Sequence, residues 1–320
     1  MDELILDILQ QLRDGSQGAL DTHQLEMLIN SHNSGIDSSA HSTEREKLIP
    51  KRAILPYFLQ VKQKNNELWQ SWNVTPELEE RFIRSVRMKP RRTASGVATI
   101  TVITRPHTCS SNCIYCPCDL RMPKSYLANE PACQRAELTF FDPYVQVAAR
   151  LQALHQMGHS TDKVELIVLG GTWSDYPEGY QYWFIKELFR ALNEWPNSPN
   201  HIKERLDWYT SFGLKNTEEA LSSFVAEQQA AVFDDTATYN QAFHKLYDTS
   251  RPHQSAWYQM ESAYDELLEQ QHINETAAAR VVGLVIETRP DTITPDNLRM
   301  FRQLGCTKIQ IGIQSTRQEI

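Results

Sequence analysis

Four short apolar runs alternate with helical segments in the later part of the chain, and this alternation limits the fold more than any other feature. The runs are rich in β-branched residues and lie at residues 96–104, 164–169, 281–287 and 309–313. Segments with helical periodicity lie between them, at residues 141–157, 180–193 and 296–304. Short strands that are joined through helices pair in parallel and are covered on their faces. The sequence therefore predicts an α/β fold with a parallel sheet.

The first ninety residues show a different pattern. An apolar stripe at helical spacing runs through residues 4–12, and a second helix is expected after Asp21. Residues 44–88 continue the helical pattern, with interruptions expected at three prolines, Pro50, Pro56 and Pro76. These features predict a small helical region over residues 1–92 and a larger domain over residues 93–320.

Composition excludes several classes of protein. Of 320 residues, 41% are hydrophobic and 22% are charged, so wholesale disorder is excluded. No apolar run is long enough to cross a membrane, and the N-terminus alternates acids with leucines instead of forming a signal peptide. We therefore expect a cytoplasmic protein with no membrane partner. Six cysteines are too few for a disulfide scaffold.

Charge is distributed unevenly within a formal net charge of −8. Residues 193–280 hold 14 acidic and 6 basic residues, which marks an acidic helical insert at about 194–279. In contrast, the run from Arg81 to Arg92 carries six basic residues and no acid. Such a run is typical of a surface that meets phosphates, and also of an ordinary solvated helix face. Composition alone does not decide between the two.

The cysteines gather directly after the first apolar run. Cys109, Cys113 and Cys116 have the spacing CxxxCxxC. Three thiolates on one short loop hold three irons of a 4Fe–4S cluster and leave the fourth iron open for the amino and carboxylate groups of a bound molecule. The alternatives are a zinc site with Cys118 as the fourth ligand, and buried structural cysteines. Zinc is disfavoured because structural zinc sites usually pair two separated CxxC-type knuckles and the Cys116-Pro-Cys118 step is tight.

This spacing resembles that of the radical S-adenosylmethionine (SAM) superfamily. The resemblance implies that Tyr115 packs near the adenine of SAM. It also implies that residues 170–172 (Gly170, Gly171 and Thr172) form the turn that holds the SAM amino group, with threonine in place of the usual acid. Glu287 and Gln314 lie at the C-terminal ends of predicted strands, where barrel enzymes collect their site residues, and we expect both to line the SAM pocket.

Several blocks are similar to the Elongator catalytic subunit family, over about residues 44–192 and 281–320. They include KPRRTASGVATITVITRPHTC, NEPACQRAELTFFDPYVQ, VVGLVIETRPD and LGCTKIQIGIQS. The resemblance implies a partial (β/α) radical SAM barrel, a 4Fe–4S cluster, SAM and a one-electron reductant. It implies an acyltransferase-type enzyme that converts the wobble uridine of tRNA to 5-carboxymethyluridine with acetyl-CoA as co-substrate. Because the last barrel strands and the acetyltransferase-type domain have no counterpart here, we expect the chain to be truncated within the barrel, with acetyl-CoA bound by a domain absent from it.

In that family the N-terminal region helps to bind tRNA. The resemblance therefore implies a tRNA contact at the basic residues of this region, namely Lys51, Arg52, Arg84, Arg87, Lys89, Arg91 and Arg92. The remaining cysteines, Cys118, Cys133 and Cys306, are interpreted as non-ligands. Two other functions stay open: a radical SAM enzyme with another substrate, and a non-catalytic tRNA-binding fragment.

Overall fold

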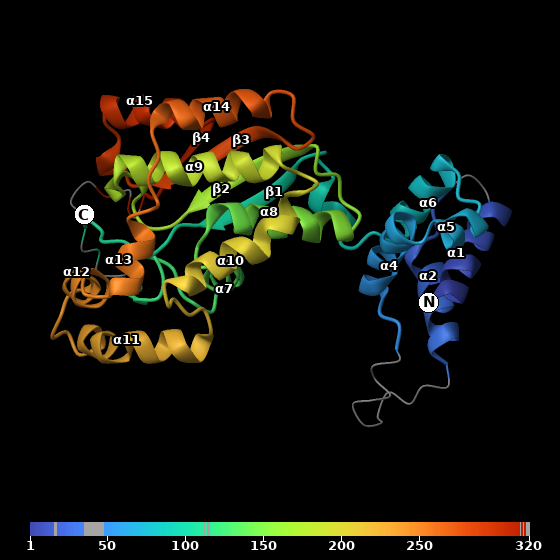
Figure 1. Ribbon diagram of the computed structural model, residues 1–320, viewed down its shortest axis with the longest axis horizontal. Helices are drawn as coiled ribbons and strands as arrows, with labels where there is room; N and C mark the ends of the chain where they lie inside the picture. Colours follow the sequence, from blue (N-terminus) through green and yellow to red (C-terminus); the bar gives the residue numbers. More distant parts are fainter. Residues whose placement is uncertain are drawn as a thin grey trace. The chain divides into compact units, whose positions relative to one another are not determined.

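The computed structural model describes residues 1–15, 18–34, 48–111, 113, 116–313, 315 and 317, and the chain divides into two compact units. The first unit comprises residues 1–96 with 153–160, and the second comprises residues 97–152 with 161–320. Figure 1 shows a helical first unit in blue and cyan and a second unit that contains the sheet. Each unit is described by itself. No helix within the described ranges is both long and apolar enough to span a bilayer.

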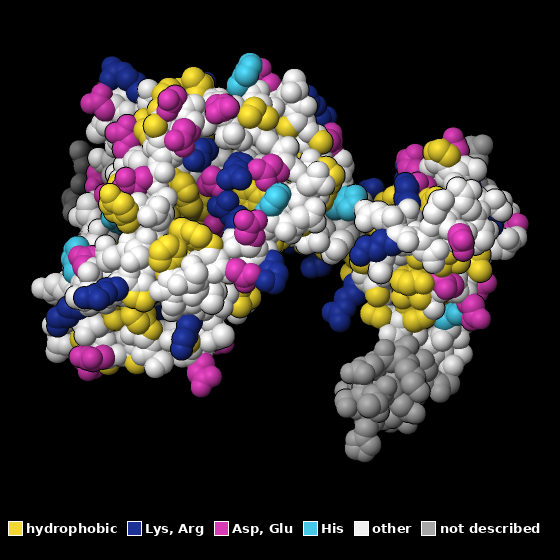
Figure 2. Space-filling model, in the orientation of Figure 1, with side chains coloured by type: hydrophobic (Ala, Val, Ile, Leu, Met, Phe, Trp, Pro, Cys, Tyr) yellow, Lys and Arg dark blue, Asp and Glu magenta, His cyan; other side chains and the backbone are white. Residues whose placement is uncertain are grey.

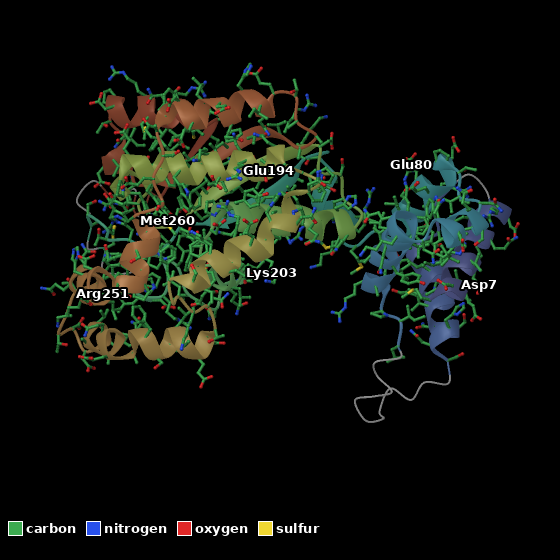
Figure 3. The ribbon with its side chains drawn as sticks, in the orientation of Figure 1. Asp7, Glu80, Glu194, Lys203, Arg251 and Met260 are labelled. Carbon is green, nitrogen blue, oxygen red and sulfur yellow. The ribbon has the colours of Figure 1, made fainter. Side chains whose placement is uncertain are left out.

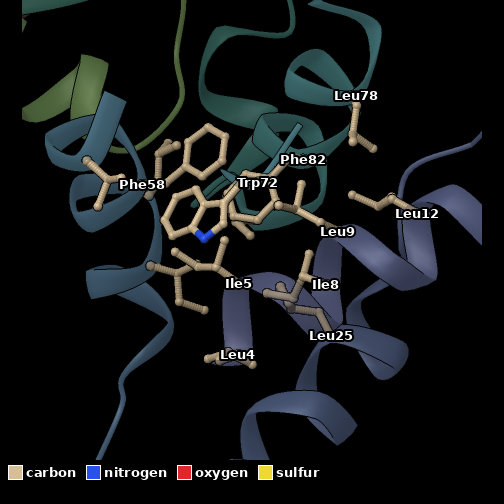
Figure 4. Packing of buried hydrophobic residues seen from close by; sticks show 14 of the residues in the cluster. Leu4, Ile5, Ile8, Leu9, Leu12, Leu25, Phe58, Trp72, Leu78 and Phe82 are labelled. Atoms are coloured by element: carbon tan, nitrogen blue, oxygen red, sulfur yellow. The ribbon is translucent and has the colours of Figure 1, made fainter. Parts of the chain in front are cut away.

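The first unit is a bundle of helices around one apolar core. Its helices are α1 (Asp2–Asp14), α2 (Thr22–Asn33), α4 (Lys51–Lys64), α5 (Asn66–Ser71) and α6 (Pro76–Val86), followed by a 3₁₀ turn at Pro90–Thr93. The stripe of α1 is fully buried, and it faces aromatic side chains from the later helices (Figure 4). Phe58 stacks on Phe82 at 4.1 Å and on Trp72 at 6.0 Å between ring centroids. The described residues of the predicted helical region, 1–92, thus form helices, and the first unit ends close to it at residue 96.

One expectation about this unit is wrong, because Pro56 does not interrupt its helix. Pro50 immediately precedes α4, and Pro76 is the first residue of α6, where its missing N–H has no helical partner in any case. Pro56, however, lies inside α4. The helix buries four apolar residues in the core, Ile54, Leu55, Phe58 and Val61. This burial outweighs the one backbone hydrogen bond that Pro56 cannot donate.

The second unit is built on a four-stranded parallel sheet. Its strands are β1 (Ala98–Ile103), β2 (Lys163–Leu169), β3 (Arg280–Thr288) and β4 (Lys308–Ile311), in the spatial order β1-β2-β3-β4. Each coincides with one of the apolar runs, so the predicted α/β fold with a parallel sheet is confirmed. Because all four strands run the same way, their carboxyl ends meet at one edge of the sheet.

The predicted crossover helices are present as well. They are α8 (Pro143–Gln156), α9 (Glu178–Asn193) and α15 (Pro295–Gln303), and α7 (Pro131–Leu138) precedes α8. The carboxylate of Asp142 accepts a hydrogen bond of 2.8 Å from the backbone N–H of Val145, so it caps α8 as its sequence position suggests. Short 3₁₀ turns follow β2 at Trp173–Asp175 and β3 at Pro290–Thr292.

The acidic insert is helical, as predicted, and it packs into the second unit. It forms α10 (Ile202–Ser211), α11 (Glu218–Phe233), α12 (Tyr239–Phe243), a π-helical turn (His244–Asp248), α13 (Arg251–Trp257) and α14 (Tyr264–Asn274). Helix α14 lies alongside α9 (Figure 1). On the face drawn in Figure 2, acidic and basic side chains of this unit are interspersed.

A buried ionic network anchors α10. Arg205 pairs with Asp142 at 3.0 Å and with Glu187 at 2.8 Å, and its guanidinium lies 4.5 Å from the ring centroid of Tyr144. The hydroxyl of Tyr144 in turn donates to Glu194, which Figure 3 labels at the end of α9. These charges are therefore used within the unit and hold the insert to the helices beside the sheet.

Candidate functional site

A cavity lies at the carboxyl edge of the sheet, and every strand contributes to its lining. Cys109 follows β1, residues 170–172 follow β2, and Gly312 follows β4. Glu287 and Thr288 are the last residues of β3, and Arg289 comes directly after it. Cys113 and Cys116 line the same cavity from the cysteine loop. The structure thus brings together the three cysteines, the Gly-Gly-Thr turn and Glu287, which come from segments far apart in the sequence.

Each of the three thiols has a hydroxyl group as a neighbour. The sulfur of Cys109 lies 3.4 Å from the hydroxyl oxygen of Thr172, and that of Cys113 lies 3.3 Å from Ser111. The sulfur of Cys116 lies 2.9 Å from the hydroxyl oxygen of Ser125. Burial raises the pKa of the Cys116 thiol, while Ser125 and the nearby Lys124 oppose this. Hydroxyl donors beside sulfur stabilise thiolate ligands and tune the iron–sulfur clusters that they hold.

The donor set fits a cluster that is bound through several irons. In a 4Fe–4S cube each thiolate binds a different iron, so the sulfurs surround a cavity and do not converge on one point. Among the described residues, no group of three or more His, Cys, Asp or Glu side chains is placed to hold a single metal ion. Cys109, Cys113 and Cys116 line one cavity and so fit this kind of donor set.

The other cysteines lie elsewhere. Cys118 donates to the carbonyl oxygen of Cys116 at 3.4 Å and packs on the apolar cluster around Tyr239 and Tyr247. Cys133 is completely buried in a separate apolar cluster, and burial raises the pKa of its thiol to about 12. Cys306 is buried as well. Their interpretation as non-ligands stays a prediction, and it agrees with these positions.

The two glycines after β2 have different reasons for being glycine. A Cβ atom on Gly170 would lie 1.9 Å from the hydroxyl oxygen of Thr104, which itself lies 2.7 Å from the hydroxyl oxygen of Tyr176. Gly171 has no such restriction, because its nearest neighbour would be the backbone of Lys124 at 3.8 Å. Glycine is thus required at position 170 because Thr104, the residue after β1, lies too close for a side chain there. At position 171 a side chain would fit, and glycine leaves the backbone accessible from the cavity.

Glu287 is held by a tyrosine that the sequence did not single out. The hydroxyl of Tyr126 donates to the Glu287 carboxylate at 2.6 Å. Burial, together with this hydrogen bond, raises the pKa of Tyr126 well above its usual range, so the phenol stays protonated and keeps donating. The carboxylate is therefore fixed in the wall of the cavity. The other two predicted SAM contacts, Tyr115 and Gln314, lie outside the described residues.

The insert holds the cysteine loop from the other side. The Asn240 side chain accepts from the Cys109 N–H at 3.1 Å and donates to the Cys109 carbonyl at 2.8 Å. Gln229 accepts from the Leu120 N–H at 2.8 Å and donates to the Cys118 carbonyl at 2.9 Å. Sequence reasoning missed both residues, because an amide side chain in a polar helix carries no pattern that marks such a contact.

The predicted tRNA-binding residues all belong to the first unit. Arg52, Arg84, Lys89, Arg91 and Arg92 are exposed, and Lys51 and Arg87 are partly buried. Arg84 forms an ion pair of 2.7 Å with Glu80, which Figure 3 labels on α6. Helix α6 ends at Val86, so the basic run continues past the helix into the 3₁₀ turn and is not a single helix face.

Comparisons with known proteins point to one family, although no family model matches the chain. A tRNA uridine(34) acetyltransferase of Methanocaldococcus infernus is 33% identical over 252 residues, which cover 77% of this chain and 35% of that protein. The protein of the same name from Dehalococcoides mccartyi is 32% identical over 232 residues, which cover 72% of this chain and 36% of that protein. Human Elongator complex protein 3 is 28% identical over 258 residues, which cover 77% of this chain and 35% of the human protein.

A solved structure carries the same family name. The archaeal Elp3 of M. infernus, truncated at its N-terminus, is 26% identical over 70% of this chain and 30% of that one, with a TM-score of 0.37. That score is too low for a comparison of the folds. The chain spans about a third of the length of the curated relatives that it matches. The resemblance seen in its motifs is confirmed, because about three quarters of this chain is similar in sequence to members of the Elongator catalytic subunit family.

Proposed function

We propose that this chain carries the radical SAM part of an enzyme that modifies the wobble uridine of tRNA. The observation that supports the proposal is the cavity at the carboxyl edge of the sheet, where three thiols, a Gly-Gly turn and a fixed carboxylate meet. The names of the relatives support tRNA uridine as the substrate class. The product is 5-carboxymethyluridine, with an acetyl group taken from acetyl-CoA, and the compartment is the cytoplasm.

Each residue around the cavity has a proposed role. Cys109, Cys113 and Cys116 hold the 4Fe–4S cluster through their sulfurs, and the neighbouring hydroxyls stabilise the thiolates. When bound, the cluster and SAM supply one-electron cleavage chemistry that begins with an electron from an external reductant. The Gly171 backbone and the Glu287 carboxylate bind the SAM amino group, since Thr172 brings no acid to the turn. Tyr115 and Gln314 complete the SAM pocket in this proposal.

The first unit is the proposed tRNA-binding region. Its exposed cations at Arg52, Lys89, Arg91 and Arg92 are suited to phosphate contacts, whose strength falls steeply with salt. Arg84 is the weakest of the predicted contacts, because Glu80 already neutralises part of its charge. Acetyl-CoA binding is assigned to a part of the enzyme outside this chain.

The test begins with anaerobic reconstitution of the chain with iron and sulfide. We expect about four irons per chain, an EPR signal on reduction that changes when SAM is added, and SAM-dependent 5′-deoxyadenosine. Cys109→Ser, Cys113→Ser and Cys116→Ser should each abolish the signal, whereas the matched controls Cys133→Ser and Cys306→Ser should retain it. Bound zinc without a cluster, or an equal loss in Cys118→Ser, would contradict the proposal.

A second candidate, a radical SAM enzyme with another substrate, is favoured by the threonine at position 172. Adding tRNA and acetyl-CoA separates the two candidates. Stimulation of 5′-deoxyadenosine formation by tRNA supports the wobble-uridine enzyme. SAM cleavage that is indifferent to tRNA supports the alternative. A cluster that forms but never responds to SAM identifies a non-catalytic fragment.

A further inference from the structure

Lys124 is a buried cation in the wall of the cavity, and no sequence motif marked it. The residue is only 3% exposed, and its ammonium donates a hydrogen bond of 2.7 Å to the carbonyl oxygen of Ser111. The ring centroid of Tyr239 lies 5.9 Å from Nζ. Within the described part of the chain, no carboxylate lies within ion-pair distance of Nζ. The positive charge is therefore buried without a carboxylate partner, although it lies close enough to the thiols of Cys116 and Cys118 to lower their pKa.

A buried ammonium without a carboxylate partner destabilises the folded state. Its removal from water is unfavourable unless an anion and hydrogen bonds compensate, and an ammonium has three N–H donors to satisfy. The Ser111 carbonyl satisfies one of them. The other cation of the cavity, Arg289, pairs with Asp291 through Nη2, while its Nη1 is buried without a hydrogen-bond partner among the described residues. Lys124 differs from Arg289 in having no carboxylate within ion-pair distance, so the experiment below compares the two cations.

The position of Lys124 limits which anion this is. Its backbone passes within 4 Å of the place that a Cβ atom of Gly171 would occupy, so it adjoins the turn proposed for the SAM amino group. In an amino acid, the amino and carboxylate groups are attached to the same carbon. A site that takes the amino group at Gly171 must therefore take the carboxylate nearby.

We propose that Lys124 binds the carboxylate of the methionine moiety of SAM. This inference rests on the proposed function, because it assigns a specificity residue within the same cavity. Through its bond to Ser111, which lies between Cys109 and Cys113 in the sequence, Lys124 also couples the occupied carboxylate site to the cysteine loop. Its role is to select and orient an amino-acid-bearing ligand.

Binding of SAM and of decarboxylated SAM tests this assignment. The two ligands differ in the carboxylate, and their affinities for the reconstituted chain are measured anaerobically by calorimetry. Lys124→Gln is expected to weaken SAM binding roughly 10- to 100-fold, the value of a charge-assisted hydrogen bond, and to leave decarboxylated SAM unchanged. Lys124→Arg should restore most of the affinity for SAM. Arg289→Gln, a matched change of the paired cation, should affect both ligands by the same factor.

Each of the other outcomes overturns a distinct claim. An equal loss for both ligands in Lys124→Gln means that Lys124 is structural, and this assignment fails. A loss specific to SAM in Arg289→Gln, with none in Lys124→Gln, assigns the carboxylate to Arg289. If the unmodified chain forms its cluster and binds neither ligand, the proposed function itself fails, and this assignment fails with it. Iron content and circular dichroism of every variant exclude misfolding as the cause.

Discussion

Removing the Asn240 side chain should loosen the cysteine loop without unfolding the domain. This amide makes two hydrogen bonds to the backbone of Cys109, at 3.1 Å to the N–H and 2.8 Å to the carbonyl. In Asn240→Ala both backbone groups lose these partners. Each such bond contributes about 1 kcal/mol net, and a buried partner left unsatisfied adds to the loss. The local cost is therefore about 2–3 kcal/mol.

Hydrogen exchange measures this cost directly, because the Cys109 amide donates to Asn240 itself. A loss of about 2–3 kcal/mol in local opening raises the exchange rate of that amide roughly 30- to 150-fold. In Asn240→Asp the carboxylate still accepts but no longer donates, so a smaller rise is expected. After reconstitution, Asn240→Ala should also hold less iron than the unmodified chain, because Cys109 is less ordered.

Asn216→Ala is the matched control. It removes another asparagine of the insert, whose amide donates to the Leu138 carbonyl and not to the cysteine loop. This variant should leave Cys109 exchange and iron content unchanged. Unaltered exchange at Cys109 in Asn240→Ala would refute the reasoning, as would an equal effect in the control.

Three further predictions concern buried groups of the second unit. Gly170→Ala should cost about 1–3 kcal/mol in urea unfolding, because its Cβ would meet Thr104 at 1.9 Å, whereas Gly171→Ala should change stability by less than about 0.5 kcal/mol. Arg205→Met leaves the buried carboxylates of Asp142 and Glu187 without their cation and should lower the free energy of unfolding by about 3 kcal/mol. An unchanged free energy of unfolding would show that the ionic network is dispensable. Burial, aided by Arg105, lowers the pKa of His253 to about 4. An unfolded histidine titrates near pH 6.5, so protons favour the unfolded state as the pH falls from about 6.5 to 4, and stability is lost across that window. His253→Phe should remove about 1–3 kcal/mol of that loss, measured as the difference in the free energy of unfolding between pH 7 and pH 4.5. An unchanged pH dependence would count against the buried neutral histidine.

Local patterns in the sequence were sufficient to predict the scaffold of this protein. The four strands, the crossover helices and the helical insert are each encoded by periodicity over a few turns or residues, and all were predicted. The cysteine spacing is equally local, since three proposed ligands within eight residues need no tertiary contact to be recognised. Pro56 shows the limit of local rules, because the core around α4 overrides the interruption that proline favours.

The surroundings of the site depended on tertiary structure alone. Asn240 is 131 residues from Cys109 in the sequence, and Tyr126 is 161 residues from Glu287. Neither pair has a spacing or composition that predicts contact, because the register of the sheet and the packing of the insert decide which polar side chains reach the cavity. The burial of Lys124 likewise follows from what packs over it. The sequence by itself determined the spacing of the three cysteines on which the proposed cluster depends, and the fold decided which other side chains contact the cysteine loop and line the cavity.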